Sequence, residues 1–287
     1  MLDMRISAGT LRFAVLGESL AHTWSPQIHN SLFAAAGLDA VYLPVTVPGD
    51  KLSSAVDVLR SCFAGFNVTI PFKERIIPLL DEVDDAVRAC GAVNTVENRG
   101  GRLIGHITDG LGMLRAIEEG GVSTRNIDVL ILGGGGAARV AGYEFLERGC
   151  RVTLAVRNPE KGERLAGELA GTQRDGRTRI SVCPLDAVPG AHDILINCTP
   201  VGMYPRTDAC PVSTDVITRC GAVFDAVYNP RRTLLIQRAE QLGIAAIEGL
   251  GMLFYQAVEA ERFWLGADAL APERAQRDIY HGLLERM

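Results

Sequence analysis

Apolar runs rich in valine, isoleucine and leucine alternate with segments of helical period along the whole chain. This alternation is typical of the βα pattern of a parallel sheet. In the first third of the chain, strands are expected at 11–17, 40–47, 65–70, 92–97 and 102–107. The last two flank Asn98-Arg99-Gly100-Gly101, a turn sequence, so we expect a hairpin beside otherwise parallel strands. The pattern predicts an α/β fold.

A second series of strands begins after a helix expected at 110–118. These strands are expected at 126–132, 151–156, 180–184, 193–197, 222–225 and 245–247. Helix-length segments separate them, as in a doubly wound nucleotide-binding domain. From Gly249 onward we expect helices only, which return to cover the short N-terminal unit. We therefore predict two α/β domains with a cleft between them: residues 1–112 with 250–287, and a Rossmann-type domain over 113–249.

The composition is that of a globular protein without an obvious polyanionic partner. The 287 residues carry 29 basic and 34 acidic side chains, a formal charge of −5. This balance disfavours nucleic acid and anionic membranes as partners. We find no apolar run of about 18 residues, and the N-terminus lacks the apolar block of a signal peptide. We expect a cytoplasmic protein, monomer or homodimer, that binds small molecules.

The cysteines and lysines limit the chemistry further. Seven widely spaced cysteines form no Cys-x-x-Cys pair or cluster of zinc spacing, so we expect reduced cysteines and no metal. Of 29 basic residues only Lys51, Lys73 and Lys161 are lysines. Because arginine keeps its proton to a pKa above about 12, whereas a buried lysine loses it readily, a site that releases a proton needs lysine. Each of the three therefore has to be considered for proton transfer.

Gly133, Gly135 and Ala138 form a Gly-x-Gly-x-x-Ala fingerprint directly after an apolar strand and at the start of a helix. Gly133 permits the tight turn, Gly135 lets backbone amides approach a pyrophosphate, and Ala138 lets the helix pack close to the strand. The N-terminus of the helix favours the anion. These features predict a dinucleotide site. The alternative is a glycine-rich βα turn without a ligand.

The end of the next strand indicates which dinucleotide is bound. Sites selective for NAD carry an acidic residue there, whereas this chain has Arg157 followed by Asn158. Arg157 suits the 2′-phosphate of NADP. A solvated arginine at the end of a strand is the alternative interpretation.

Thr23 and Ser25 lie at the start of an expected helix with Pro26 at its first position. Two hydroxyl groups and the positive end of a helix form a candidate carboxylate site. The alternative is that Ser25 only caps the helix. His22 and His29 flank this segment without a metal partner, and we expect them to be structural.

Two further residues are candidates for catalysis. An apolar strand stops at Pro71, which is expected to start a helix with Lys73 in its first turn. A cation there opposes the helix dipole, which favours a functional role, although an ion pair with Glu74 or Glu82 is the alternative. Asp109 precedes a helix, where a capping aspartate is ordinary. Together Lys73 and Asp109 would supply the acid and the orienting carboxylate that carbonyl reduction requires.

Six segments, taken in order over almost the whole chain, resemble shikimate dehydrogenase. They are GFNVTIPFKE at 65–74, GAVNT at 91–95, TDG at 108–110, NCTPVGM at 197–203, DAVYNP at 225–230 and EGLGMLFYQ at 248–256. The resemblance implies reversible, NADP-dependent reduction of 3-dehydroshikimate to shikimate, a step toward chorismate and the aromatic amino acids.

The resemblance also implies roles by motif position. Lys73 and Asp109 would form the catalytic pair and contact the substrate, whose carboxylate Thr23 and Ser25 would hold. The ring hydroxyls would be bound by Thr69, Asn94 and Gln256, with Tyr228 nearby. The cofactor would be held by Gly133, Gly135, Gly136, Ala137, Ala138, Arg157, Asn158, Thr199, Met203, Gly249 and Met252.

The spacing near the C-terminus agrees with these roles. On a helix that starts near Gly251, Met252 and Gln256 share a face, so one helix could touch both nicotinamide and substrate. A packing face with one buried glutamine is the alternative.

Three departures from the family pattern keep alternatives open. Thr23 stands where the family usually has serine, while Ile107 and Val156 stand where it usually has asparagine. A quinate/shikimate or aminoshikimate dehydrogenase that uses NAD or NADP is therefore one alternative. A regulator that binds a dinucleotide without turnover is another.

Overall fold

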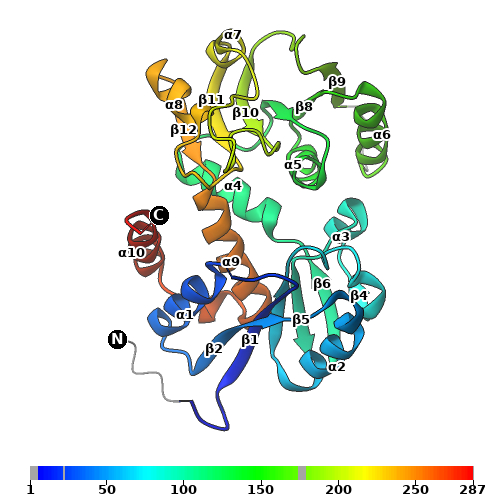
Figure 1. Cartoon of the computed structure of the whole chain (residues 1–287), viewed down its shortest axis with the longest axis vertical. Helices are drawn as coiled ribbons and strands as arrows, with labels where there is room; N and C mark the ends of the chain where they lie inside the picture. The colour runs from blue at the N-terminus through cyan, green and yellow to red at the C-terminus, as the bar shows by residue number, and fades with distance from the viewer. Residues whose placement is uncertain (1–5, 22, 174–178, 287) are drawn as a thin grey trace. The chain divides into compact units, whose positions relative to one another are not determined.

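The chain divides into two compact units. The computed structural model describes residues 6–21, 23–173 and 179–286. Unit 1 comprises the chain up to Thr108 and from Gln256 onward, and unit 2 runs from Asp109 to Tyr255. The expected return of the C-terminal helices to the first part of the chain is confirmed (Figure 1). His22, expected to be structural, lies outside the described residues.

Among the described residues, unit 1 contains one six-stranded sheet with the order β2-β1-β3-β5-β6-β4. Its strands are β1 Leu11–Gly17, β2 Ala40–Thr46, β3 Gly65–Val68, β4 Glu82–Val83, β5 Thr95–Arg99 and β6 Arg102–His106. β1 runs parallel to β2 and β3, whereas β5 is antiparallel to β3 and β6. The expected hairpin of β5 and β6 is confirmed. In its turn, Gly101 N donates a hydrogen bond to Asn98 Oδ1 at 2.7 Å.

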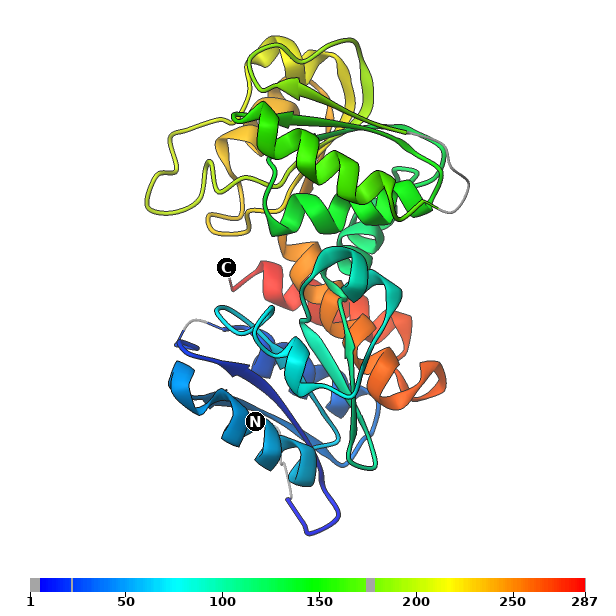
Figure 2. The same ribbon diagram turned by 90° about the vertical axis from the view of Figure 1, so that its right-hand side faces the viewer.

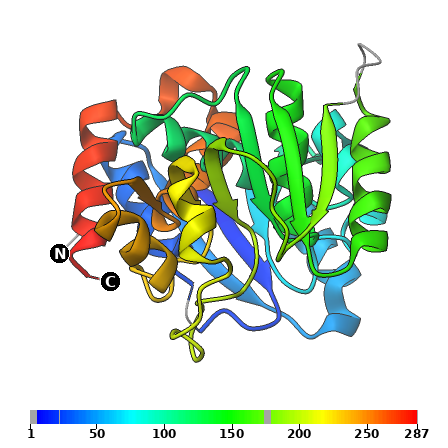
Figure 3. The ribbon, with the colours of Figure 1, turned by 90° about the horizontal axis from the view of Figure 1, so that it is seen from above.

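Helices cover both faces of this sheet. They are α1 Ser25–Ala35, α2 Leu52–Cys62, α3 Asp85–Cys90, the C-terminal part of α9 Leu250–Leu265 and α10 Glu273–Leu284, with 3₁₀ turns η1 Gly49–Lys51, η2 Ile77–Leu79 and η3 Ala267–Ala269. Phe13 of β1 packs against Phe33 of α1 and Trp264 of α9, with ring centroids 5.1 and 4.8 Å away. Figures 1 and 3 show α2 on the opposite side of the sheet from α1.

The helix expected after Pro71 is absent, and that prediction is wrong. The segment forms consecutive turns that lead into η2. Ile77 N donates to Glu74 O, and Leu79 N donates to Ile76 O, which are 3₁₀-type bonds. Pro78 has no N–H to donate to Glu74, so a regular helix cannot continue through it. Lys73 therefore does not oppose a helix dipole.

Unit 2 is a doubly wound parallel domain, as predicted. Its sheet has the order β12-β11-β10-β7-β8-β9, and the described strand pairs are all parallel. The strands are β7 Asp128–Leu132, β8 Arg151–Val156, β9 Ile180–Pro184, β10 His192–Asn197, β11 Cys220–Asp225 and β12 Ala245–Glu248. The order reverses between β7 and β10, and in doubly wound folds ligands bind at the carboxyl ends of the strands beside such a reversal.

The helices of unit 2 are α4 Asp109–Glu119, α5 Gly136–Glu147, α6 Pro159–Ala170, α7 Thr214–Thr218, α8 Leu234–Gln241 and the start of α9. α5 and α6 pack on β8 and lie side by side in Figure 2, while α7 and α8 pack on β11. None of the helices that the structure describes is long and apolar enough to cross a membrane.

Candidate active site

The start of α1 carries the two predicted carboxylate ligands in unit 1. Thr23 Oγ1 donates to Ser25 Oγ at 3.2 Å, and Ser25 N donates to Thr23 Oγ1 at 3.3 Å. Trp24, not Ser25, occupies the capping position, and no side chain caps the helix there. The alternative in which Ser25 only caps the helix is therefore wrong. The half-buried hydroxyls lie together at the positive end of α1.

A buried tyrosine fixes the orientation of Ser25. Tyr42 donates from its hydroxyl to Asn67 Oδ1 at 2.6 Å and also hydrogen-bonds with Ser25. Burial raises the pKa of Tyr42 well above its usual value, and the Ser25 bond opposes that effect. Tyr42 therefore keeps its proton, donates to Asn67 and accepts from Ser25.

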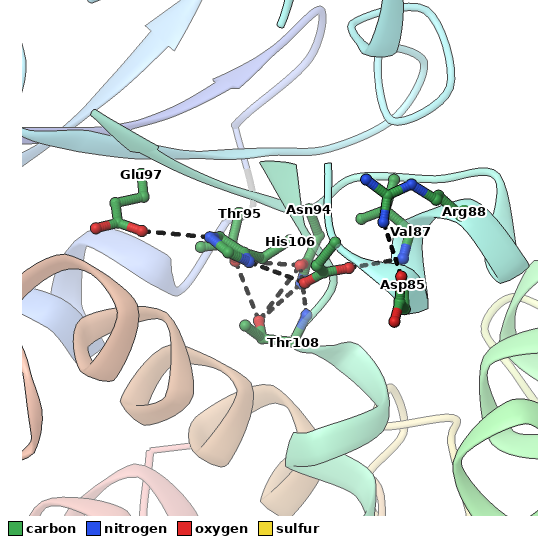
Figure 4. A network of polar contacts seen from close by, with 9 residues as sticks. Asp85, Val87, Arg88, Asn94, Thr95, Glu97, His106 and Thr108 are labelled. Atoms are coloured by element: carbon green, nitrogen blue, oxygen red, sulfur yellow. Dashed lines mark hydrogen bonds and ion pairs between the residues drawn. The ribbon is translucent and has the colours of Figure 1, made fainter. Parts of the chain in front are cut away.

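Asn94 is the centre of a buried polar cluster in unit 1. Its Oδ1 accepts from Thr108 N at 2.7 Å, and its Nδ2 donates to Thr108 Oγ1 at 3.0 Å and to Gln256 Oε1 at 3.4 Å. Thr95 Oγ1 also donates to Asn94 Oδ1. Figure 4 shows Asn94, Thr95 and Thr108 pointing toward one another. The fold thus unites two predicted substrate ligands, Asn94 and Gln256, from distant parts of the sequence.

Lys73 lies in the turns between β3 and η2. Phe72 and Ile76 anchor these turns because both side chains are buried. The Lys73 carbonyl accepts from Val93 N at 2.8 Å, and its side chain is half-buried. This bond ties the Lys73 segment to the loop that carries Asn94. Thr69, another predicted ligand, is half-buried at the end of β3.

Asp109 is the first residue of α4 and the first of unit 2. It is half-buried, and it directly follows Thr108, whose backbone is held by Asn94. A Cβ added to the next residue, Gly110, would lie 2.5 Å from Glu144 Cγ, so the first turn of α4 packs tightly against α5. The two neighbours of Asp109 along the chain are therefore each held by contacts within their own unit.

The glycine fingerprint has the predicted context between β7 and α5. Gly133 has φ of +109°, a conformation that disfavours other residues, and its added Cβ would meet Thr199 Cγ2 at 3.1 Å. Gly135 precedes α5 without a side-chain cap, and an added Cβ at Gly135 or Gly136 would meet no atom within 4 Å. Ala138 is buried. The exposed glycine backbone thus offers helix N–H groups to an anion.

The remaining predicted cofactor ligands lie in unit 2. Arg157 is exposed at the end of β8, and Asn158 caps α6 by accepting from Lys161 N at 3.1 Å. Met203 and Tyr228 are exposed, whereas Thr199, Ala137 and Met252 are half-buried and Gly249 is buried. Asn158 therefore has a structural task besides any contact with a ligand.

The sequence analysis assigned no role to several buried polar residues of unit 1 that hydrogen-bond to predicted ligands, or to the pair Asn197 and Asp225 of unit 2, which is bonded at 2.8 Å; those of unit 1 are Tyr42, Asn67, Thr95 and Thr108. The sequence feature that could have identified them is a polar residue within or next to an apolar run that predicts a buried strand. Among the described residues, no group of three or more His, Cys, Asp or Glu is placed to hold a metal ion.

Comparisons with known proteins agree with this arrangement. Residues 15–96 match the family model described as the shikimate dehydrogenase substrate binding domain. A protein of Moorella thermoacetica named shikimate dehydrogenase (NADP(+)) is 39% identical over 273 residues, 94% of this chain and 92% of the relative.

Solved structures give the same result. Shikimate 5-dehydrogenase from Thermus thermophilus, in complex with NADP(H) and shikimate, is 32% identical with a TM-score of 0.84, covering 95% of this chain and 99% of that one. Quinate dehydrogenase from Corynebacterium glutamicum, in complex with NAD, is 27% identical with the same TM-score of 0.84, covering 95% and 99%. This chain therefore belongs to the shikimate dehydrogenase family.

Proposed function

We infer that this chain is a shikimate dehydrogenase, an enzyme that reversibly reduces 3-dehydroshikimate to shikimate with NADP on the way to chorismate and the aromatic amino acids. The observation that carries the inference is the nearly full-length likeness to relatives named shikimate dehydrogenase (NADP(+)). The substrate and the dinucleotide are both small molecules, which agrees with the sequence analysis.

Unit 1 supplies the proposed substrate contacts. At the start of α1, the hydroxyls of Thr23 and Ser25 rotate in this proposal, so that the protons they give to Ser25 and Tyr42 in the free protein are donated to the substrate carboxylate instead. The buried amides of Asn94 and Gln256 bind ring hydroxyls by exchanging their mutual 3.4 Å hydrogen bond for bonds to the substrate, because each amide can both donate and accept. Thr69 lies at the end of the strand that leads to Lys73 and adds a third contact. Tyr228 of unit 2 completes the proposed set.

Lys73 and Asp109 perform the proposed proton chemistry. Lys73 donates a proton or a hydrogen bond to the alkoxide that forms as the C3 carbonyl is reduced. Asp109 orients Lys73 and a substrate hydroxyl. Because Lys73 lies in unit 1 and Asp109 in unit 2, the proposal requires both to meet at the substrate.

The residues of unit 2 fit a bound NADP, which supplies the hydride. The open backbone at Gly135, Gly136 and Ala137 suits a pyrophosphate, while Gly133 and Ala138 allow close packing of the turn. Arg157 has the charge and exposure to pair with a 2′-phosphate, and Asn158 lies beside it. Around the nicotinamide we place Thr199, Met203, Gly249 and Met252.

The domain assignment follows from these roles. Residues 1–112 with 250–287 form the proposed substrate domain and residues 113–249 the proposed dinucleotide domain; these bounds differ by a few residues from those of units 1 and 2, so that Asp109 and Met252 lie at the boundary. A monomer or homodimer and a cytoplasmic location stay predictions.

A panel of two substrates and two cofactors tests the function. Purified protein is assayed at 340 nm with shikimate or quinate, each with NADP⁺ or NAD⁺. We expect the highest kcat/KM for shikimate with NADP⁺. A preference for quinate with NAD⁺ would instead support the second candidate, which the threonine at position 23 and the likeness to quinate dehydrogenase favour. Binding of NADP⁺ without turnover of shikimate or quinate, or of aminoshikimate in a separate assay, would indicate a non-catalytic regulator.

A further inference from the structure

Asp225, the last residue of β11, carries a carboxylate that the proposed chemistry does not use. Its side chain is 0% exposed. Burial raises the pKa of Asp225 to about 6, although hydrogen bonds from Thr233, Val227 and Asn197 oppose that shift. Burying a carboxylate is unfavourable unless its hydrogen bonds are satisfied. The bonds that Asp225 accepts therefore show what this residue organises.

Three donors from different segments of unit 2 meet at Asp225. Its Oδ1 accepts from Asn197 Nδ2 at 2.8 Å and from Val227 N at 3.0 Å. Its Oδ2 accepts from Thr233 Oγ1 at 2.6 Å, and Thr233 caps α8. One carboxylate thus joins the end of β10, the loop after β11 and the start of α8.

The carboxylate also determines the orientation of Asn197. Because an ionised carboxylate only accepts hydrogen bonds, the group of Asn197 that faces it has to be the NH₂. The amide oxygen of Asn197 then faces Thr199, whose N and Oγ1 donate to it at 3.0 and 2.7 Å. Since the Thr199 hydroxyl donates to Asn197, its oxygen is left to accept from Val201 N at 3.2 Å. Asp225 and the Thr199 N–H therefore together fix which way the hydrogen bonds run in the loop after β10.

The segments held in this way carry proposed NADP contacts. Thr199 packs against Gly133 of the glycine-rich turn. A Cβ added to Gly249 would lie 2.5 Å from Asp225 O and 2.8 Å from Ala226 O, so Gly249 packs directly on the backbone of this segment. Val227, held by Asp225 Oδ1, directly precedes Tyr228. Asp225 thus contacts or supports the segments that carry three proposed ligands: Thr199, Gly249 and Tyr228.

We propose that Asp225 is a positioning residue for NADP, which acts through Asn197 on the loop that carries Thr199 and Met203. The proposal rests on the proposed function, because it concerns the same cofactor site. Asp225 itself touches neither the cofactor nor the substrate in this proposal. Its loss should weaken NADP binding while leaving the substrate contacts of unit 1 intact.

The test measures the Kd for NADP⁺ by isothermal titration calorimetry and the KM values for both substrates. Asp225→Ala removes the strong acceptor of the Asn197 NH₂ and leaves that group only its longer bond of 3.4 Å to Val201 O, so we expect the Kd and KM for NADP⁺ to rise roughly tenfold or more. The KM for shikimate should stay within about twofold of the wild-type value. A folded Asp225→Ala protein with wild-type NADP⁺ affinity overturns the proposal.

Asp225→Asn is the conservative variant. An amide oxygen at the Oδ1 position still accepts from Asn197 and Val227, while the new NH₂ group donates to the Thr233 oxygen. We therefore expect a Kd for NADP⁺ within about threefold of wild type. A loss of NADP⁺ affinity as large as that of Asp225→Ala would contradict the inference that Asp225 acts by accepting hydrogen bonds from Asn197 and Val227.

Thr233→Val is the matched control, because it removes the bond to Oδ2 and leaves Oδ1 with its two donors. Its Kd should also remain within about threefold of wild type. If Asp225→Ala does not fold, Asn197→Ala is tested instead. It removes the amide that links Asp225 to Thr199 and leaves Asp225 with two hydrogen-bond donors, Val227 and Thr233. That variant should lose NADP⁺ affinity, and wild-type affinity in it overturns the proposal. Failure of the wild-type protein to bind NADP⁺ contradicts the proposed function instead.

Discussion

At the scale of single residues, a buried histidine and a buried glutamate connect two helices of unit 1. His29 Nδ1 of α1 lies 2.8 Å from Glu261 Oε1 of α9, and both side chains are at most 1% exposed. Burial lowers the pKa of His29 to about 3 and raises that of Glu261 to about 9. The folded pair therefore retains one proton from acidic pH to well above neutrality, wherever that proton resides.

This retained proton predicts how stability depends on pH. In the unfolded chain the pair holds two protons below pH ~4.5, one up to ~6.5 and none above. Because the folded pair keeps its proton up to about pH 9, stability falls as pH rises from ~6.5, by up to about 1.4 kcal/mol per pH unit. In Glu261→Gln this decline should vanish, whereas the exposed control Glu273→Gln should retain it. Urea unfolding between pH 6.5 and 8.5 measures the difference, and parallel curves for wild type and Glu261→Gln would contradict it.

The proton donor can be tested at Lys73. Lys73→Arg keeps a cation but cannot release a proton near neutral pH, so we expect kcat to fall roughly 100-fold or more. The Kd for NADP⁺ should stay unchanged. Lys51→Arg is the matched control, since Lys51 is exposed and its ammonium lies 3.5 Å from the exposed carboxylate of Asp50. Near-normal turnover in Lys73→Arg would remove the role of Lys73 as proton donor.

At the scale of elements, two glycines of one turn should respond differently to alanine. Gly133→Ala introduces strain because φ is +109°, and it should lower stability by roughly 1–3 kcal/mol. Gly135 has extended backbone and open space around its added Cβ, so Gly135→Ala should fold normally. Its methyl group should still obstruct the pyrophosphate and weaken NADP⁺ binding. Thermal unfolding and calorimetry check both variants, and equal stability losses would contradict this assignment.

The elements of unit 2 were predicted more accurately than those of unit 1. β8 and β9 begin and end at the expected residues, because buried parallel strands form continuous apolar runs. β5 begins at Thr95 rather than near residue 92, since Val93 N and Asn94 N bond to Lys73 O and His106 O instead of extending the strand pairing. Such loop bonds depend on residues far away, which local patterns do not contain.

In the candidate site, too, contacts between residues far apart in the sequence could not be predicted from local patterns. Gln256 was identified through its motif, yet its bond to Asn94 joins residues 162 positions apart. The Asp225 and Tyr42 contacts were missed because a single polar residue in an apolar strand does not reveal its partners.

At the scale of the whole molecule, Asn94 contacts both points where the chain passes between the units. The chain leaves unit 1 after Thr108 and re-enters it at Gln256. Thr108 N donates to Asn94 Oδ1, and Asn94 Nδ2 donates to Gln256 Oε1. A proposed substrate ligand is therefore also the residue that holds both connections on the side of unit 1.

This arrangement predicts separate patterns of hydrogen exchange for the two ligands. Shikimate alone should slow amide exchange near Thr108 and Gln256 and at the start of α1, because its proposed contacts hold these segments. NADP⁺ alone should slow exchange at 133–139 and 197–203, which belong to unit 2. Arg157→Ala is the control: it should reduce the NADP⁺ pattern and leave the shikimate pattern unchanged. If shikimate alone protected mainly the glycine-rich turn, the proposed assignment of the substrate contacts to unit 1 would be wrong.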